Sequence, residues 1–156
     1  MRVSAMDLAM SYLASRDRTR KEILLYLTDK GFDTSDISSV IQRLEELRLI
    51  DDRKYAENFV RSRLASKPHS KMSLYHQLLS HQIPEQIIES VLDDIPEDSD
   101  YENALLLAVK FFRQFRDLDP VLRRQRVLSR LQFRGYTYDI SKRVFEYVEA
   151  DEEENI

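Results

Sequence analysis

The chain of 156 residues contains no cysteine. This absence excludes disulfide bonds, thiolate zinc sites and cysteine nucleophiles. Glycine and proline are scarce, with 2 and 4 residues, while charged residues make up 33 % of the chain. This combination disfavours sheets joined by tight turns and favours helices with solvated outer faces. We therefore predict an all-α fold.

Motifs of catalysis are missing as well. Two glycines cannot supply a phosphate-binding loop, and no Rossmann pattern, nucleophile elbow or zinc-protease motif occurs. The three histidines are spaced by seven and five residues, which does not give the i, i+4 geometry of a helical metal site. We expect no enzymatic activity, no cofactor and no metal.

Long apolar runs are also lacking. No run approaches the roughly 20 residues that a membrane span requires, and no secretory signal follows the first residues. We expect a cytoplasmic protein that does not contact the membrane.

What the chain does contain is a repeat. A helical run, a tight turn with a bulky residue and a second helical run with an apolar pair occur three times, at offsets of 51 and 104 residues. The three copies are Leu27–Phe32 with Val40 and Ile41, Leu78–Ile83 with Val91 and Leu92, and Leu131–Tyr136 with Val144 and Phe145. A period near fifty residues is typical of stacked helical arrays.

A further helical segment precedes each copy, which gives three three-helix repeats. We place them at residues 1–50, 51–96 and 97–149, followed by a flexible acidic tail at 150–156. Because a repeat of fewer than about fifty residues is barely stable alone, neighbouring repeats should stack. We expect an elongated, curved array that exists as a monomer.

Several helix ends can be read directly from the residues. Thr19 and Glu22 have the spacing of a capping box, as do Ser99 and Glu102. Gly31 permits the left-handed turn that ends a helix, and Asp119 followed by Pro120 is a typical helix start.

Charge is strongly segregated along the chain, although the net charge is only −4. Between Lys110 and Arg143 ten basic residues face three acidic ones. Four arginines of this segment recur at helical spacing and occupy an arc of about 80° on one helix side: Arg123, Arg126, Arg130 and Arg134. An unpaired row of guanidiniums suits phosphates or an acidic protein surface. The alternative is a solvated helix face paired with acidic residues.

Other basic residues extend this candidate surface. Arg113 and Arg116 adjoin the row, and a second basic stretch contains Arg61, Arg63, Lys67 and Lys71. Nearby aromatic residues can stack on bases, but their helical spacing is more typical of core positions: Phe111, Phe112, Phe115, Tyr136 and Tyr138.

Several segments resemble the RecX family, bacterial regulatory proteins that modulate the recombinase RecA. The resemblance is carried by Leu49–Arg63, by Tyr12–Arg16 with Thr19 and Glu22, by Lys30–Phe32, and by Leu131–Asp139. It covers almost the whole chain in order. Arg48 and Gln82 depart from the pattern, because each stands where the family commonly has glycine.

The resemblance implies three tandem helix-turn-helix-like modules without catalysis. It also implies binding in the groove of the RecA filament on DNA, which inhibits ATP hydrolysis, strand exchange and co-protease activity and so modulates homologous recombination and the SOS response. The basic face would meet acidic filament surface or DNA phosphates.

Two other functions stay open at this point. A helix-turn-helix transcription factor needs base-reading residues at the start of its recognition helix, but the candidate helices here start with acidic residues such as Asp36, Glu85 and Asp139. A pure protein scaffold would leave the arginines merely solvated.

Overall fold

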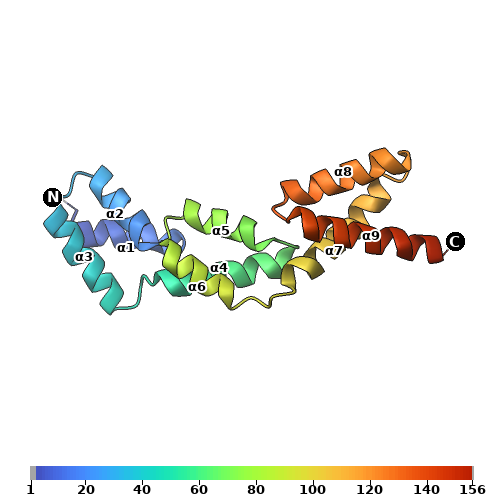
Figure 1. Ribbon diagram of the computed structural model, residues 1–156. Coiled ribbons are helices and arrows are strands. Elements are labelled where there is room, and N and C mark those ends of the chain that lie inside the picture. The colour runs from blue at the N-terminus through green and yellow to red at the C-terminus, as the bar shows by residue number, and fades with distance from the viewer. Residues whose placement is uncertain (1–2, 156) are drawn as a thin grey trace. The chain divides into compact units, whose positions relative to one another are not determined.

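The computed structural model describes residues 3–155, which form nine helices and no strand (Figure 1). The helices are α1 (Ala5–Ser15), α2 (Arg20–Asp29), α3 (Thr34–Glu46), α4 (Asp52–Ser66), α5 (Lys71–Ser80), α6 (Glu85–Asp93), α7 (Ser99–Gln114), α8 (Pro120–Phe133) and α9 (Tyr138–Glu154). The predicted all-α class and the three successive groups of three helices are confirmed.

Side-chain caps explain where several helices begin. Both bonds of the Thr19–Glu22 capping box are present at the start of α2. Asp119 caps α8 with Pro120 in its first turn, and Thr137 caps α9 through a 3.2 Å bond from the Ile140 amide. The caps at Thr19 and Asp119 were predicted, and the cap at Thr137 follows the same rule. In each case a side-chain oxygen accepts from a helix amide that has no partner within the helix.

The capping box predicted at Ser99 is wrong. Helix α7 begins at Ser99, so the N-cap position belongs to Asp98 and not to Ser99. The Asp98 side chain makes no cap bond. The turn before the helix, closed by the Ser99 amide on the Pro96 carbonyl at 3.1 Å, starts the helical path earlier. The Ser99 hydroxyl instead accepts a 3.3 Å bond from Asn103.

The expected acidic tail is helical where the structure describes it. Helix α9 continues through Glu154, and the Asn155 amide donates to the Asp151 carbonyl at 2.8 Å. This bond satisfies one of the carbonyls left open at the helix end.

The chain packs as two compact units. The first contains Met1–Val60 and Gln77–Val91, and the second contains Arg61–His76 and Leu92–Ile156. In the first, α1, α2 and α3 enclose an aliphatic core that includes Ile23, Leu27 and Leu44. In the second, α7, α8 and α9 enclose a larger core with Phe111 and Phe145 at its centre.

The middle three helices are divided between these units, because α4, α5 and α6 each contribute residues to both. Several apolar residues of these helices and of the turns beside them are nonetheless buried: Ala56, Val60, Leu74, Leu78, Ile83, Ile88, Val91, Leu92 and Ile95. The repeat boundaries at 50, 96 and 149 stay a prediction.

One contact occurs twice, once in each unit. The Thr19 hydroxyl, fully buried at the start of α2, donates to the His81 carbonyl at 2.7 Å. The Ser70 hydroxyl, fully buried at the start of α5, donates to the Arg134 carbonyl at 2.9 Å. Each hydroxyl also accepts from the amide three residues later. We call these two contacts the hydroxyl locks.

The turn residue after each acceptor carbonyl is left-handed. Gln82 has φ 65° and Gly135 has φ 96°, while Gly31 in the first repeat has φ 91°. Arg48 is also left-handed, with φ 57°. The two positions that depart from the glycine pattern therefore keep the glycine-like backbone, at a steric cost.

We predict that Thr19→Val lowers the free energy of unfolding by about 2–3 kcal/mol, because it removes a helix cap and leaves the His81 carbonyl unpaired. Chemical denaturation measures this change. Thr137→Val is the matched control, since Thr137 is exposed and only caps its helix, and it should cost about 1 kcal/mol. Equal losses in both variants would contradict a role for the lock.

We also predict that Gln82→Gly raises the free energy of unfolding by about 0.5–1 kcal/mol, since relief of left-handed strain exceeds the entropy that glycine loses. Gly31→Ala is the control of opposite sign, because no atom lies within 4 Å of the added methyl group and only the backbone conformation is penalised. Destabilisation by Gln82→Gly would show that this turn carries no strain.

Candidate functional site

The arginine row lies on α8 as predicted, but its members differ in exposure. Val127, Leu128 and Leu131 turn into the core of the second unit. Arg126, Arg130 and Arg134 are exposed, whereas Arg123 is half-buried. The row therefore offers three solvent-facing guanidiniums rather than four.

Arg123 is held within the second unit. Its Nε donates to the Phe112 carbonyl at 2.9 Å, a second guanidinium nitrogen bonds the same oxygen, and the guanidinium carbon lies 3.2 Å from the centre of the Phe112 ring. Burial lowers the pKa of the Arg123 guanidinium, although Glu152 and Glu149 oppose the shift. Arg123 thus fastens α8 to α7.

Arg130 and Arg134 extend over aromatic rings on their way to solvent. Their guanidinium carbons lie 5.9 and 5.8 Å from the Phe111 ring centre, and Arg130 lies 5.4 Å from that of Phe115. Cation–π contacts of this kind orient a guanidinium without neutralising its charge. Among the described residues neither arginine forms an ion pair within 4 Å.

The second basic stretch meets the end of α8 at His69. Burial lowers the pKa of the His69 imidazole first, and the positive charges of Lys67, Arg63 and Arg134 lower it further. These cations are therefore close enough to act on one imidazole. Within the described residues, Nε2 of His69 is buried without a hydrogen-bond partner.

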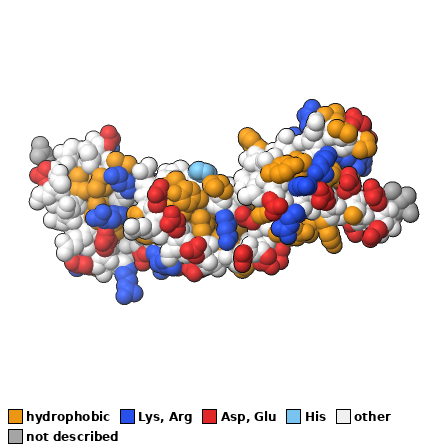
Figure 2. Space-filling model, in the orientation of Figure 1, with side chains coloured by type: hydrophobic (Ala, Val, Ile, Leu, Met, Phe, Trp, Pro, Cys, Tyr) orange, Lys and Arg blue, Asp and Glu red, His pale blue; other side chains and the backbone are white. Residues whose placement is uncertain are grey.

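The remaining candidate cations have distinct surroundings. Lys71 is half-buried, and its Nζ donates to the Ile95 carbonyl at 3.3 Å, so it acts within the fold. Arg61 is exposed on α4. Arg113 and Arg116 are exposed at the end of α7 and just after it. Figure 2 shows basic side chains interleaved with hydrophobic ones over α7, α8 and α9.

Acidic residues of α9 cover the other end of the row. Arg124 lies 3.6 Å from Glu146, and a groove of about 270 Å³ combines Arg123 with Glu149, Glu152 and Glu153. The positive surface is therefore concentrated toward the C-terminal end of α8.

Sequence reasoning missed Phe133. Its side chain is 89 % exposed at the last residue of α8, among the arginines. Of the aromatic residues that were weighed for stacking, Phe111, Phe112 and Tyr136 are core residues, and only Tyr138 is largely exposed. The sequence signal that finds Phe133 is its angular position: at 100° per residue it lies about 20° beyond Arg126, at the edge of the arginine arc and away from the core residues of α8.

Two of the three histidines are half-buried, and His76 is exposed. His81 is half-buried, with Nδ1 3.1 Å from the Tyr55 hydroxyl, and His69 is also half-buried. Across residues 3–155, no group of three or more His, Asp or Glu side chains is arranged to hold a metal ion. Within the same residues, no helix has the length and apolar character to cross a membrane.

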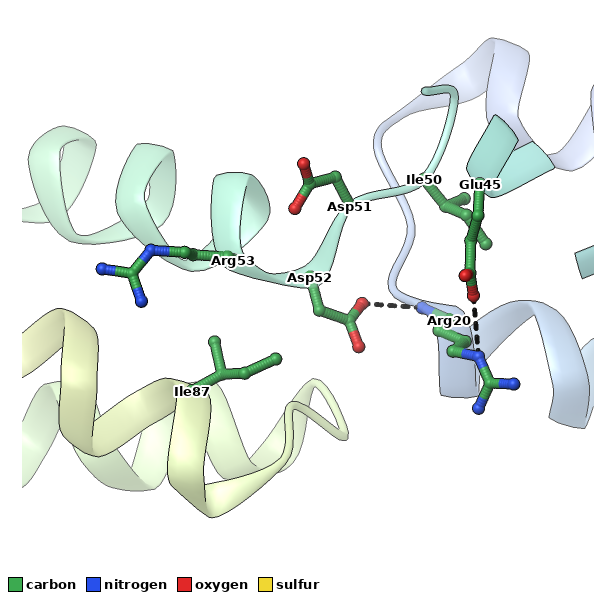
Figure 3. A pocket seen from close by; sticks show the side chains of 7 residues that line it. All are labelled: Arg20, Glu45, Ile50, Asp51, Asp52, Arg53 and Ile87. Atoms are coloured by element: carbon green, nitrogen blue, oxygen red, sulfur yellow. Dashed lines mark hydrogen bonds and ion pairs between the residues drawn. The ribbon is translucent and has the colours of Figure 1, made fainter. Parts of the chain in front are cut away.

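A pocket of about 380 Å³ in the first unit is lined by Glu45, Asp51, Asp52, Arg20, Arg53, Ile50 and Ile87 (Figure 3). Asp52 accepts from the Arg20 amide at 2.9 Å, and the Arg20 side chain bonds Glu45 at 2.8 Å. Burial raises the pKa of the Asp52 carboxyl group. Asp51 caps α4 through the Lys54 amide at 3.1 Å, so both aspartates serve helix starts.

The described helices define an all-α protein of three tandem three-helix domains, and comparison with known proteins identifies the family. The chain matches the family models of the first, second and third three-helix domains of RecX at residues 5–44, 51–92 and 97–145.

Named relatives and a solved structure agree. The chain is 34 % identical over 132 residues to a protein of Chlorobium phaeobacteroides named Regulatory protein RecX, covering 85 % of each chain. It is 30 % identical to an Enterococcus faecalis protein of the same name, over 96 % of this chain and 57 % of that one. The crystal structure of RecX from Lactobacillus salivarius superposes with a TM-score of 0.85 at 25 % identity, covering 94 % and 95 % of the two chains. The chain belongs to the RecX family, whose named relatives are regulatory proteins.

Because Arg123 is a packing residue, we predict that Arg123→Ala lowers the free energy of unfolding by about 1–2 kcal/mol. Arg123→Lys should not restore it, since an ammonium group lacks the planar fork. Thermal unfolding with Arg126→Ala as control measures the effect, because Arg126 is exposed and should change stability by less than about 0.5 kcal/mol. If Arg123→Ala leaves the free energy of unfolding unchanged, Arg123 is not a packing residue and stays a candidate binding residue.

Proposed function

We propose that this protein regulates homologous recombination and the SOS response by binding the RecA–DNA filament. Bound in the filament groove, it inhibits ATP hydrolysis, strand exchange and co-protease activity without catalysing a reaction. Membership in the RecX family and the exposed arginines of α8 support this proposal. It acts as a cytoplasmic monomer.

The distribution of charge supports binding to a polyanionic partner. Arg126, Arg130 and Arg134 are solvent-facing, and Lys67 lies near the end of the same row. Such a surface attracts DNA phosphates or acidic protein groups through contacts that weaken with salt. Three tandem modules can engage several neighbouring filament subunits at once, which converts modest contacts into a long residence time.

The first turns of α3, α6 and α9 support the same choice over a transcription factor. Each contains an acidic residue: Asp36, Glu85 and Asp139. Carboxylates at the start of a would-be recognition helix repel the DNA backbone and disfavour sequence-specific reading of the major groove.

We predict that reversing Arg126, Arg130 and Arg134 to Glu raises the concentration needed to inhibit ATP hydrolysis by a RecA filament by about tenfold or more. The reason is that three attractive contacts become repulsive. ATP hydrolysis on single-stranded DNA, titrated with wild-type and variant protein, measures the change, and circular dichroism verifies folding.

The control reverses three exposed lysines of the first unit: Lys21, Lys30 and Lys54. It makes the same change in net charge and should inhibit nearly as well as the wild type. Equal loss in both variants would indicate a general effect of net charge, and unchanged inhibition by the α8 variant would remove the arginine row from the binding surface.

A further inference from the structure

Phe133 is the most exposed large hydrophobic residue in the described part of the chain, at 89 %. Its position at the end of α8 contributes nothing to the core of the second unit. An apolar ring of this size in water weakens solubility and adds no packing energy. The ring is therefore open to contact with a partner.

The ring belongs to the arginine row. At 100° per residue, Phe133 lies within about 20° of Arg126 and about 60° of Arg130 around the helix axis. Along the axis, Arg130 stands between the other two, with a rise of about 6 Å from Arg126 to Arg130. Arginine, arginine and phenylalanine thus follow one another on a single exposed helix face.

More positive charge gathers where this row ends. Arg134 follows Phe133 directly, and Arg134, Lys67 and Arg63 all act on His69. The Ser70 lock holds the loop before α5 against the Arg134 carbonyl at 2.9 Å. Asp139, the acidic residue at the start of α9, lies 3.7 Å from Arg143.

We propose that this corner of the second unit, formed by Phe133 with Arg126, Arg130, Arg134 and Lys67, binds single-stranded nucleic acid. An unpaired base stacks on the Phe133 ring, and the guanidiniums and the ammonium group contact phosphates on either side. The proposal deepens the proposed function and rests on it for the biological source of the strand, the DNA of the filament.

A single strand fits these groups better than the alternatives do. Its bases expose their flat faces, while its phosphates repeat at intervals comparable to one helical turn, and proteins that bind such strands combine cationic grooves with aromatic platforms. Base faces inside a duplex are covered by neighbouring pairs, so a duplex would use the arginines alone. An acidic protein surface would also use the arginines, and it would accept any apolar side chain at position 133.

The test is binding of the full chain to a fluorescein-labelled oligothymidine of about 15 nucleotides, measured by anisotropy at low salt. Phe133→Ala should weaken binding about tenfold. Phe133→Tyr should retain affinity, and Phe133→Leu should not, since leucine is apolar but has no π-face. Val121→Ala is the matched control, because Val121 is 69 % exposed on the same helix outside the arginine arc, and it should bind like the wild type.

A second readout uses the absence of tryptophan from the chain. Phe133→Trp introduces the only tryptophan of the chain at the corner, and oligothymidine should quench its emission, excited selectively over the eight tyrosines, by stacking. Poly-glutamate, which offers charge without bases, should leave the emission unchanged. A hairpin duplex with closed ends should bind with little dependence on residue 133.

Three results would overturn the proposal: equal affinity of Phe133→Ala and wild type, full retention in Phe133→Leu, or oligothymidine binding to Phe133→Trp without quenching. Preference for poly-glutamate would assign the corner to an acidic protein surface instead. RecA inhibition is measured separately for each variant. If Phe133→Ala loses RecA inhibition but still binds oligothymidine, the stacking site alone is wrong. If oligothymidine binding depends on the ring at position 133 but the wild-type protein does not inhibit RecA, the proposed function alone is wrong.

Discussion

In each unit, one buried hydroxyl group joins two segments: it accepts a hydrogen bond from its own helix and donates one to the turn of another. Thr19 and Ser70 occupy equivalent places in successive repeats, cap their own helices, and donate to the carbonyl just before the left-handed residue of the following repeat. A fully buried hydroxyl without partners would be costly, so the helix start and the turn must stay in register. Since the first lock lies wholly in one unit and the second wholly in the other, the same rule organises both.

The Ser70 lock also builds the candidate site. It brings the loop that carries Lys67 and His69 to the turn after α8, where the arginine row ends. The approach is close enough that a Cβ atom at residue 135 would collide with the Ser70 hydroxyl, which explains the glycine there beyond its positive φ. Residues more than sixty positions apart thereby share one electrostatic environment. The fold thus concentrates positive charge that the sequence presents in separate stretches.

Periodicity and caps predicted most of the fold, because both are local. The Thr19 capping box and the helix start at Asp119 follow from residues within a few positions of one another, and the repeat follows from matching such local patterns along the chain. The prediction of a capping box at Ser99 was wrong because the preceding turn, closed by the Ser99 amide, starts the helical path earlier. The role of Arg123 was also hidden, since its carbonyl partner at Phe112 lies on another helix and helical spacing alone cannot separate a packed guanidinium from a solvated one. Phe133 was missed because aromatic residues are usually buried, although its position at the edge of the arginine arc indicates the exposed side chain that the structure has.

The contrast between Arg123 and Arg130 shows how one row of identical side chains serves two purposes. Near the start of α8, the guanidiniums contact groups within the fold. Arg123 bonds the Phe112 carbonyl and shares a groove with carboxylates of α9, and Arg124 lies beside Glu146. Toward the end of the helix, ring contacts hold the guanidiniums in place and leave their charge available to a partner. Because the whole chain is negative at −4, long-range attraction to polyanions is weak, and binding at the proposed corner would depend on close contact. The proposed corner would therefore select its partner by the exposed Phe133 ring as well as by charge, which favours a strand with unpaired bases over a polyanion without them.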